Sequence, residues 1–363
     1  MRRGVCKVTK PNEQFWRDKK VYVTGHTGFK GSWLTIWLDK MGAQVTGFAL
    51  EPNTVPSIFN ELCLQTRCRS INANINDYKK LRDSIFDSCP DVIIHMAAQP
   101  IVADGYSDPK NTFQTNVIGT VNVLEVAREI SWDCRVLVVS SDKCYENNEI
   151  GTAFKVGDSL GGHDPYSASK ACTEIVTNAY RNSFFTDKNV HVASARAGNV
   201  IGGGDWSSDR LIPDAARAFS NNETLTIRNP NATRPWQHVL EPIFGYLKLI
   251  EALETNAALR APFNFGPLSD GAATVKNVVE IFCEAWGDGK RYEISPQQLA
   301  IKEAELLTLD CNETFNKLNW HPKLNLTNSI QWTANWYKFF YNNPSSSALK
   351  EFTLSQISEY EAI

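Results

Sequence analysis

The chain has 363 residues, of which 42% are hydrophobic and 21% charged, a composition that suits an ordinary soluble globular protein of up to two domains. The formal charge of -3 and the pI near 6.1 give no reason to expect binding to nucleic acid or to an anionic membrane. The nine cysteines are scattered without a metal-binding spacing, and neither a signal peptide nor a run of roughly 18 apolar residues occurs, so we expect free thiols, no metal site and a cytoplasmic location.

Residues 1–14 are mildly basic, with Arg2, Arg3, Lys7 and Lys10 among them. This stretch has no apolar periodicity, so we expect a tail that is disordered or loosely docked.

A glycine turn then stands between a strand and a helix. Residues 19–24 form a short β-rich run, and Gly25, Gly28 and Gly31 follow it; helical apolar spacing leads on to a second strand at residues 44–50. Gly25 permits the tight turn, Gly28 lets backbone approach a pyrophosphate, and Gly31 allows helix and strand to pack closely. This unit predicts that the chain binds a dinucleotide.

Glu51 follows the second strand. An acidic side chain at this place would accept hydrogen bonds from the adenosine ribose and would repel a 2′-phosphate, which favours NAD over its phosphorylated relative. The alternative is that Glu51 is only a solvated turn residue.

Strands and helices continue to alternate. Residues 74–77 end a third strand, residues 91–100 form a fourth strand that runs into a small-residue loop, and residues 111–130 have helical spacing. His95, on the fourth strand, is predicted to be a packed core histidine. The alternation predicts an α/β fold with a doubly wound parallel sheet.

The stretch from residue 136 to residue 170 contains the candidate catalytic groups. Its apolar beginning predicts a buried strand that ends in Ser-Ser-Asp-Lys, and ligands bind at this end of open parallel sheets. Tyr166 and Lys170 would lie one turn apart on one face of a helix. The alternative is a capped turn and an ordinary surface pair. The groups that would converge are Ser141, Asp142, Lys143, Tyr166 and Lys170.

A second glycine-rich turn, Gly202-Gly203-Gly204-Asp205-Trp206, leads to Arg210. Exposed glycine backbone beside a guanidinium could hold a diphosphate, or the glycines could simply build a tight surface turn. Arg228, further along, could be a ligand contact or a surface charge at a strand edge.

Five blocks, in order, resemble the extended short-chain dehydrogenase/reductase family, and the resemblance is closer to its CDP-glucose 4,6-dehydratase branch. It covers roughly residues 15 to 345. The blocks are Phe15-Trp16, His26-Thr27-Gly28-Phe29-Lys30-Gly31-Ser32-Trp33, Ser140-Ser141-Asp142-Lys143-Cys144-Tyr145, Arg196-Ala197-Gly198-Asn199-Val200-Ile201-Gly202-Gly203-Gly204-Asp205-Trp206 and Arg234-Pro235-Trp236-Gln237-His238-Val239.

The resemblance implies a Rossmann NAD-binding domain over residues 15–198, with its sheet completed by segments within 235–266, and a smaller substrate lobe over residues 199–345. We expect residues 346–363 to form a tail, and the protein to be a homo-oligomer, dimer or tetramer. The expected cofactor-binding residues are Gly25, His26, Thr27, Gly28, Phe29, Lys30, Gly31, Glu51, Asn74, Ile75, Ala97, Ala98, Gln99, Asn116, Tyr166 and Lys170. The expected substrate-binding residues are Gln99, Ser141, Asn199, Arg210, Leu211, Arg228, Arg234 and Asn264.

The resemblance also implies the reaction, NAD-dependent conversion of CDP-D-glucose to CDP-4-dehydro-6-deoxy-D-glucose and water, for deoxysugar biosynthesis that serves O-antigen or another surface polysaccharide. Tyr166 would be the base for the C4 hydroxyl, its phenolate favoured by Lys170, and Ser141 would hold the same oxygen. Asp142 would protonate the C6 hydroxyl, and Lys143 would take the C5 proton.

Position 143 is a departure, because the dTDP-glucose and GDP-mannose branches have glutamate there; Asn74 likewise replaces an aspartate that contacts adenine. A nucleotide-sugar 4-epimerase and a non-catalytic NAD-sensing protein are the alternatives. The Asp142-Lys143 pair argues against the first, and the intact Ser141, Tyr166 and Lys170 argue against the second.

Overall fold

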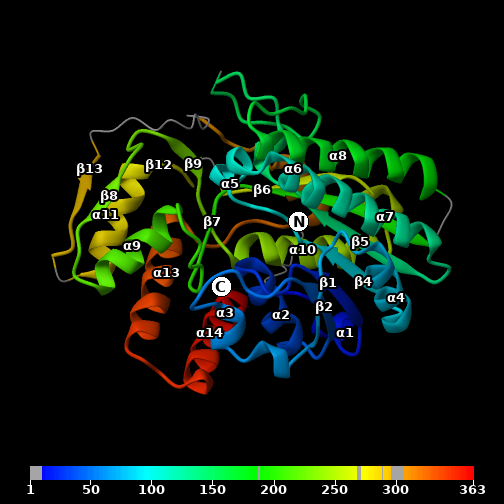
Figure 1. The fold of residues 1–363 in the computed structure, drawn as a ribbon, viewed down its shortest axis with the longest axis horizontal. Helices are drawn as coiled ribbons and strands as arrows, with labels where there is room; N and C mark the ends of the chain where they lie inside the picture. The colour runs from blue at the N-terminus through cyan, green and yellow to red at the C-terminus, as the bar shows by residue number, and fades with distance from the viewer. Residues whose placement is uncertain (1–9, 150, 187–188, 268–270, 288, 296–305) are drawn as a thin grey trace, which may run out of the picture.

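A seven-stranded parallel sheet forms the centre of the molecule (Figure 1). The computed structural model describes residues 10–149, 151–186, 189–267, 271–287, 289–295 and 306–363. The strands, in their order across the sheet, are β11 (Pro262–Phe265), β6 (Val190–Ala197), β5 (Cys134–Val139), β4 (Val92–His95), β1 (Lys20–Thr24), β2 (Gln44–Ala49) and β3 (Arg69–Asn72). The strand order reverses between β1 and β4, where an open sheet of this kind binds ligands. The predicted doubly wound α/β fold is confirmed.

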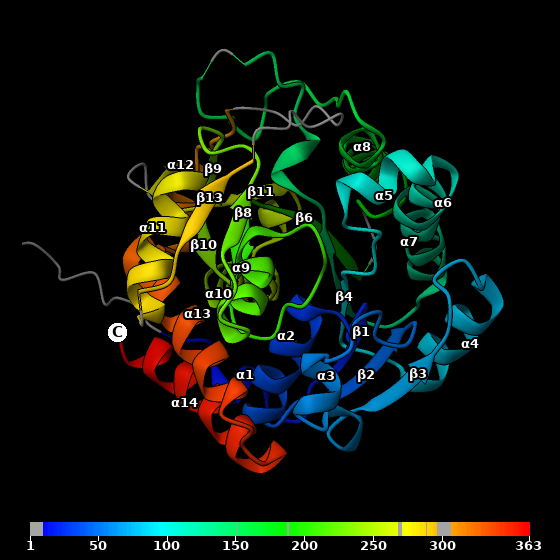
Figure 2. The ribbon, with the colours of Figure 1, turned by 60° about the vertical axis from the view of Figure 1, so that its left-hand side comes forward.

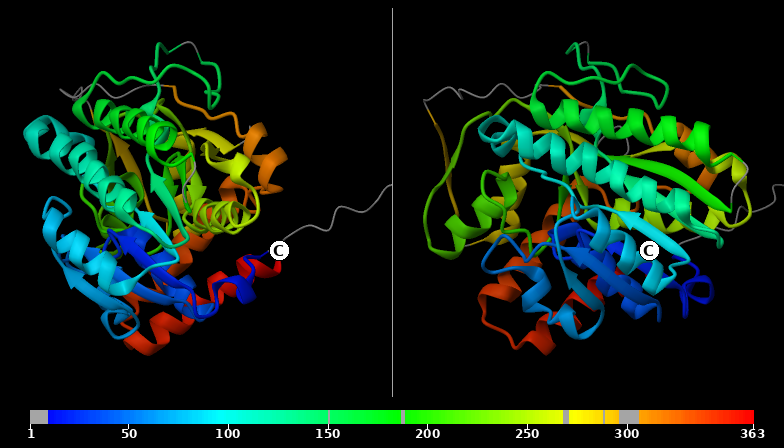
Figure 3. Two further views of the ribbon diagram at one scale, coloured as in Figure 1. Left: turned by 90° about the vertical axis from the view of Figure 1, so that its right-hand side faces the viewer. Right: turned by 45° about the vertical axis from the view of Figure 1, so that its right-hand side comes forward.

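Helices cover both faces of the sheet (Figure 3). One face packs against α4 (Tyr78–Ser88), α7 (Gly119–Glu129) and α8 (Pro165–Phe184), and the other against α2 (Phe29–Lys40) and α10 (Leu240–Leu253). Every residue of β4 and β5 is buried, as expected of parallel strands covered on both sides. Short helical elements lie in the connections between the longer ones: α3 (Ile58–Glu61), η1 (Leu64–Thr66), α5 (Val102–Ser107), η3 (Asp142–Cys144) and η4 (Ala257–Leu259).

The helix predicted over residues 111–130 is interrupted by a π turn. It consists of α6 (Pro109–Phe113), the π turn η2 (Gln114–Ile118) and α7. The wider π turn places Asn116 in the interior, where its amide donates to Ser169 Oγ at 2.8 Å. Apolar spacing alone does not distinguish such a turn from a regular helix.

Segments that follow β6, apart from α10, β11 and α14, form a smaller body beside the sheet (Figure 2). It contains three two-stranded sheets, in which β7 pairs with β10, β9 with β12 and β8 with β13. The strands are β7 (Val200–Ile201), β8 (Leu225–Ile227), β9 (Thr233–Pro235), β10 (Gln237–His238), β12 (Ala272–Thr274) and β13 (Tyr292–Ile294), and the helices are α9 (Leu211–Ser220), α11 (Val275–Trp286), α12 (Asn312–Leu318) and α13 (Leu326–Tyr341).

The predicted C-terminal tail is wrong. Residues 346–362 form α14 (Ser346–Ala362), which packs against α2 and α13 and buries Leu349, Ile357 and Tyr360. Buried Thr353 accepts a hydrogen bond from Trp336 Nε1 at 2.9 Å. Because a polar residue occupies a buried position of the helix, apolar spacing did not reveal the buried face.

The described part of the N-terminal segment is also docked, not loose. Asn12 caps α1 (Glu13–Trp16), and its backbone N–H donates to Glu251 Oε1 at 2.7 Å. Trp16 is fully buried and donates to the same oxygen at 2.8 Å. Residues 1–9 lie outside the described residues. Among those described, no helix has the length and apolar content to cross a membrane.

Candidate active site

The glycine turn follows β1 and opens at the N-terminus of α2. Gly25 has a φ of +75°, and a Cβ there would lie 2.8 Å from the backbone nitrogen of Ala97. A Cβ at Gly31 would lie 2.2 Å from the carbonyl oxygen of Gly25, so this position requires glycine as well. Gly28 is exposed and serves as the N-cap of α2 without a side-chain cap. The first N–H groups of the helix are therefore available to an anion such as a pyrophosphate.

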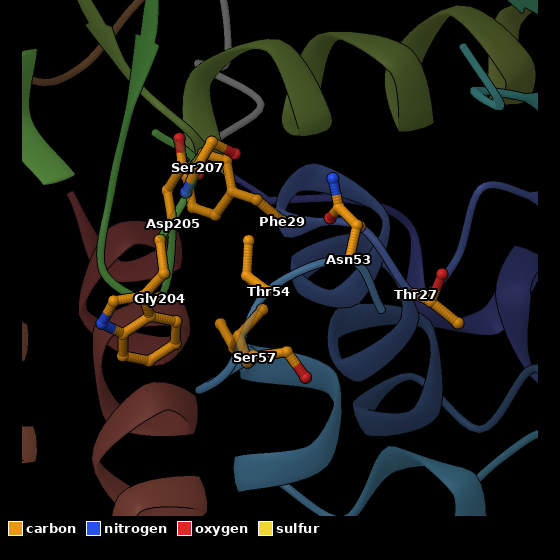
Figure 4. Close-up of a pocket in the computed structure, with 11 residues that line it drawn as sticks. Thr27, Phe29, Asn53, Thr54, Ser57, Gly204, Asp205 and Ser207 are labelled. Atoms are coloured by element: carbon orange, nitrogen blue, oxygen red, sulfur yellow. The ribbon is translucent and has the colours of Figure 1, made fainter. Parts of the chain in front are cut away.

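A small pocket lies beside this helix end (Figure 4). Thr27, Phe29 and Ser57 line one part of it, and Asp205 and Ser207 line another. The predicted cofactor residue His26 points elsewhere: its ring is buried against Phe59, and Nε2 lies 2.8 Å from Ser70 Oγ. His26 therefore offers a bound cofactor its backbone and not its side chain.

Hydrogen bonds to Thr24 and Asn116 fix the loop that follows β4. Buried Thr24 accepts hydrogen bonds from the backbone N–H of Ala97 at 3.1 Å and lies 2.7 Å from His95 Nδ1, so His95 is the packed core residue predicted. Asn116 accepts from the backbone N–H of Gln99 at 2.8 Å. The Gln99 side chain folds back on its own loop and bonds Ile101, which leaves Ala97 and Ala98 partly exposed at the reversal of the strand order.

Glu51 and Asn74 lie at the far side of the glycine turn. Both are exposed, and Glu51 accepts a hydrogen bond from Asn72 Nδ2 at 2.7 Å. The third strand ends at Asn72, two residues before the predicted Asn74, whose side chain accepts from the backbone N–H of Asn76 at 2.9 Å. Ile75 is buried.

Four predicted catalytic groups meet at the carboxyl end of β5, and we call Ser141, Asp142, Tyr166 and Lys170 the catalytic edge. All four side chains are buried. Asp164 caps α8 and Pro165 occupies its first turn, which sets the start of the helix so that Tyr166 faces β5. Ser141 Oγ donates to Asp142 Oδ1 at 3.0 Å and lies near enough to the Tyr166 hydroxyl to lower its pKa. The predicted convergence is present in the structure.

Burial controls the charges at this edge. It raises the pKa of Asp142, against the opposing effects of Lys143, the Ser141 hydroxyl and Arg234. Asp142 Oδ2 is buried without a hydrogen-bond partner among the described residues. Burial therefore shifts this carboxyl toward its protonated form, and a ligand could supply the hydrogen bond that Oδ2 lacks in the described structure.

Lys170 is not among the main influences on the pKa of Tyr166 in the described structure. Burial raises the pKa of Tyr166 to about 12, and the Ser141 hydrogen bond is the largest opposing effect. Burial also lowers the pKa of Lys170 to about 8, and its ammonium donates to the carbonyl oxygen of Val139 at 3.5 Å. The four-residue spacing indicates that Tyr166 and Lys170 are neighbours, but it does not indicate how strongly each is desolvated.

Two more lysines lie near this edge. Lys143 follows Asp142 in η3 and is half-buried. Lys30, in the first turn of α2, donates to the hydroxyl of Tyr246 in α10 at 3.4 Å. Desolvation lowers the pKa of Lys30 to about 7, and the positive charges of Lys170 and Arg210 lower it further while Asp142 opposes them. Lys30 thus lies between the glycine turn and the catalytic edge.

The predicted substrate residues separate into two groups. Arg234, buried in β9, lies near enough to Asp142 to lower its pKa, and Arg210, at the N-terminus of α9, affects Tyr166 in the same direction. Leu211 begins that helix, and Asn199 is half-buried. Arg228 instead is exposed and pairs with Asp209 at 3.2 Å.

Asn264 is fully buried, which contradicts its predicted contact with substrate. Its Oδ1 accepts from the Tyr145 hydroxyl at 2.6 Å, and its Nδ2 donates to the carbonyl oxygens of Phe154 and Asp310. Its position on a late strand of the sheet is as predicted, but its amide group is fully used in hydrogen bonds to other segments of the chain.

The second glycine-rich turn does not expose its backbone as expected. Gly203 and Gly204 are buried, and a Cβ on them would lie 2.0 Å from Trp336 and 2.7 Å from Ile58. The carbonyl oxygen of Gly203 accepts from Trp33 Nε1 at 2.9 Å. Close packing against α3 and α13 therefore explains these glycines.

A larger cavity, of about 450 Å³, was not expected from the sequence. The loop after η3 lines it on one side, and Thr233, next to Arg234, lines it on another. Polar side chains in a segment with no periodicity gave no signal for it. The lining residues are Glu146, Asn147, Asn148, Gly151, Thr152, Phe154, Asp158, Ser159, Thr233, Leu306 and Thr308.

The sequence is similar to those of known nucleotide-sugar enzymes. The family model of GDP-mannose 4,6 dehydratase matches residues 22–333. A CDP-glucose 4,6-dehydratase from Salmonella typhimurium is 45% identical over 333 residues, which are 90% of this chain and 92% of that protein. A UDP-glucose 4-epimerase from Mycoplasma pneumoniae is 25% identical, over 89% of this chain and 98% of that protein.

Two solved structures share the fold. An epimerase from Methanothermobacter thermautotrophicus superposes with a TM-score of 0.78 at 22% identity, over 91% of this chain and 95% of that one. A dTDP-glucose 4,6-dehydratase from Bacillus anthracis, solved in complex with NAD, superposes with a TM-score of 0.73 at 21% identity, over 90% and 98%. Epimerases and dehydratases therefore share this architecture, and the residues at the catalytic edge must distinguish them.

Proposed function

Because the chain belongs to the GDP-mannose 4,6-dehydratase family, we propose that it oxidises C4 of a nucleotide hexose, removes water across C5 and C6 and reduces C6, and that the nucleotide hexose is CDP-D-glucose. The product is CDP-4-dehydro-6-deoxy-D-glucose, a precursor for deoxysugar biosynthesis. The nucleotide is supported by the 45% identity to a CDP-glucose 4,6-dehydratase. The single observation that carries the reaction type is Asp142, a buried carboxyl with a free oxygen beside Ser141 and Tyr166. A 4-epimerase has no step that requires this acid.

The cofactor we propose is NAD, held by residues 15–198, while residues 199–345 hold the nucleotide sugar. Gly25, Gly28 and Gly31 form a turn with no room for side chains at its first and last positions, and the N-terminus of α2 is open to a pyrophosphate. Ala97 and Ala98 leave space at the reversal of the strand order. When bound, NAD supplies the oxidation at C4, the matching reduction at C6 and a positive ring near Tyr166.

The first half-reaction uses Tyr166, Ser141 and Lys170. Tyr166 accepts the proton of the C4 hydroxyl, and Ser141 holds the same oxygen by hydrogen bond. Burial raises the pKa of Tyr166 to about 12, so Tyr166 holds its own proton before substrate arrives and must lose it to solvent as the ligands bind before it can accept this one. Lys170, when protonated, stabilises the negative charge that results.

The second half-reaction removes water from C5 and C6. With C4 oxidised to a ketone, the C5 proton becomes acidic, and Lys143 is the proposed base for it. Asp142 donates its proton to the C6 hydroxyl as that group leaves. Burial raises the pKa of Asp142, which favours the protonated form that this step requires. Arg210 and Arg234 are the proposed contacts to the diphosphate.

The test is a panel of CDP-, dTDP-, GDP- and UDP-hexoses incubated with the protein and NAD, with products analysed by mass spectrometry and NMR. We expect loss of one water and a 4-keto signal, fastest with CDP-glucose. An isomer of unchanged mass would indicate a 4-epimerase. Binding of NAD without any product would indicate a sensing protein and refute the proposed reaction.

We further propose a homo-oligomer, dimer or tetramer, that works in the cytoplasm. Exposed Ile118 and Ile175 on the adjacent helical segments η2 and α8 support contact with a second copy, and the eight described cysteines, all free, suit a reducing compartment. Light scattering after size exclusion would measure the oligomeric state. A monomer at working concentration would refute the first part of this proposal.

A further inference from the structure

A fully buried ion pair lies directly behind the catalytic edge. Glu174 of α8 and Arg196 of β6 are 2% and 3% exposed, and their Oε2 and Nη2 atoms are 2.9 Å apart. No step described above uses either residue. Buried ion pairs are often no more stabilising than apolar residues of the same size, so stability alone does not account for this one.

Glu174 connects the helix of Tyr166 and Lys170 to two strands. Its Oε1 accepts a short hydrogen bond from the hydroxyl of Ser140, the residue before Ser141, and its Oε2 accepts one from Ser194 Oγ at 2.9 Å. The carboxylate thus joins α8 to the end of β5, where Ser141 is positioned, and to β6.

Arg196 extends the same network to η3. Its Nη1 donates to the Tyr145 hydroxyl at 2.8 Å and to the carbonyl oxygen of Val156 at 3.0 Å. Tyr145 in turn donates to Asn264 at 2.6 Å. Tyr145 directly follows η3, which contains Asp142 and Lys143. The ion pair therefore contacts the residue before Ser141, through Glu174, and the residue after η3, through Arg196.

The pair remains charged. Burial alone would raise the pKa of Glu174, but the Arg196 guanidinium and the hydroxyls of Ser140 and Ser194 outweigh burial and lower it. Glu174 likewise raises the pKa of Arg196 against the effect of burial. A full negative charge therefore lies one helical turn from Lys170.

Tyr166 and Asp142 share the catalytic edge with Lys170, and the other described titratable groups that interact with it are Glu174, Cys144, His95 and Lys30. Glu174 raises the pKa of Lys170 the most. Burial keeps the Cys144 thiol and the His95 ring neutral, because it raises the pKa of the first and lowers that of the second to about 3. Lys30, from α2, has the same charge sign as Lys170. Because the Cys144 thiol is neutral, Glu174 is the main group that opposes the effect of burial and favours a proton on Lys170.

We propose that Glu174 is a positioning residue for the dehydratase reaction: it fixes Ser140, and so Ser141, against α8, and its charge keeps Lys170 protonated, while Arg196 fixes Glu174 and Tyr145. This inference rests on the proposed function. Glu174 itself does not contact substrate or cofactor.

The test compares Glu174→Gln, Glu174→Asp and the parent in the pH dependence of kcat/KM for CDP-glucose. Loss of the Lys170 proton ends activity at alkaline pH, and a neutral side chain at position 174 makes that loss easier. We expect Glu174→Gln to move the alkaline limb about one pH unit lower and Glu174→Asp to restore it. If Glu174→Gln lowers the rate equally at every pH, the proposal is wrong and the pair is only structural.

A second measurement does not depend on turnover. Competitive acetylation across pH, followed by mass spectrometry of the Lys170 peptide, reports the pKa of Lys170 directly. A downward shift in Glu174→Gln supports the inference even if no nucleotide hexose is a substrate, and an unmoved pKa in an active enzyme overturns the inference alone. If Glu174→Gln does not fold, Glu174→Gln/Arg196→Gln removes the unpaired charge and should show the same shift. Glu241→Gln, a fully buried glutamate outside this network, is the control and should leave the Lys170 pKa unchanged.

Discussion

The catalytic edge and the contact of α10 with α14 both bury carboxyl groups, but they differ in how many protein donors each carboxyl receives. We call the second region the C-terminal anchor and define it as Glu241, Lys323, Tyr360 and Glu361. Glu241 accepts the backbone N–H groups of Lys323 and Leu324, at 2.8 and 2.7 Å, and the Tyr360 hydroxyl at 2.6 Å. Glu361 accepts from Trp37 and Lys40 of α2. Each carboxyl of the anchor is bonded through the protein itself.

Asp142 at the catalytic edge is different. Its Oδ1 accepts from Ser141, but its Oδ2 is buried without a partner in the described structure. An unsatisfied buried oxygen costs about 1–3 kcal/mol, so it persists where a ligand completes the hydrogen bonding. The difference teaches that burial alone does not identify a reactive group. Asp142 differs from the anchor carboxyls because its incompletely bonded oxygen lies beside Ser141 and Tyr166.

The largest effect should come from Tyr166→Phe. The ring still packs, so NAD and substrate still bind, but the proton acceptor for C4 oxidation is gone. We expect turnover to fall by roughly 2 to 4 orders of magnitude, measured with CDP-glucose at saturating substrate.

Tyr180→Phe is the matched control on the same helix, because its hydroxyl bonds Glu125 away from the catalytic edge. It should retain parent activity. If Tyr166→Phe also retains parent activity, Tyr166 has no part in the mechanism. Its buried hydroxyl would then be only structural, like the buried groups of the anchor.

Asp142→Asn should separate the two half-reactions. Ser141, Tyr166 and the cofactor remain in place, so C4 oxidation proceeds, but an amide cannot protonate the C6 hydroxyl. Water loss should slow by about two orders of magnitude. Under single turnover the absorbance of reduced cofactor should persist in the variant, whereas in the parent it should be brief.

Lys143→Ala should stall at the same point, or less severely if a water takes the C5 proton. Should Asp142→Asn form no reduced cofactor at all, Asp142 would belong to the oxidation step or to the fold. Its free oxygen would then not mark the elimination step.

Much of this site could be predicted because its signals are local. The spacing of Gly25, Gly28 and Gly31 follows from the geometry of one turn, and the apolar run before Ser141 predicts a strand end. Tyr166 and Lys170 share a helix face by their four-residue spacing. In a parallel sheet these strand ends must meet at one edge, so the convergence followed from the fold.

The parts that were missed depend on contacts between distant segments. The pKa of Tyr166 depends on how α2, α10 and the smaller body enclose it, which no spacing predicts. Glu174 lies four residues after Lys170, so the helix face could have indicated it, but its partner Arg196 is on another strand. The buried face of α14 was hidden because it includes Thr353, which is polar and hydrogen-bonded.

The anchor provides a stability test. Burial raises the pKa of Glu241 to about 7 from an ordinary 4.5, so between these values the folded state binds more protons than the unfolded state. Stability from this group is therefore present at low pH and is lost as pH rises through this window, by about 3 kcal/mol. Glu241→Gln should remove that loss, and urea unfolding at pH 5 and pH 8 would measure it.

Glu359→Gln on the exposed face of α14 is the control and should keep the pH dependence of the parent. If Glu241→Gln keeps it too, Glu241 does not titrate in this window. Glu241 would then be ionised in the folded protein, as Glu174 is in its pair with Arg196.

Glu51 adds an exposed carboxyl to the comparison, and its removal should have the smallest effect. It accepts a hydrogen bond from Asn72 at the end of β3 and is open to solvent, so no desolvation strengthens its interactions. Glu51→Ala should weaken NAD binding about two- to tenfold, since one hydrogen bond contributes roughly 0.5–1.5 kcal/mol. It should also relax discrimination against the 2′-phosphorylated cofactor, because the carboxylate no longer repels that phosphate. Equilibrium titration with both cofactors measures the ratio, and Asn72→Ala, which keeps the carboxylate, should leave it unchanged. A ratio that Glu51→Ala does not alter would make Glu51 a solvated turn residue, and cofactor choice would then depend on other residues around the ribose.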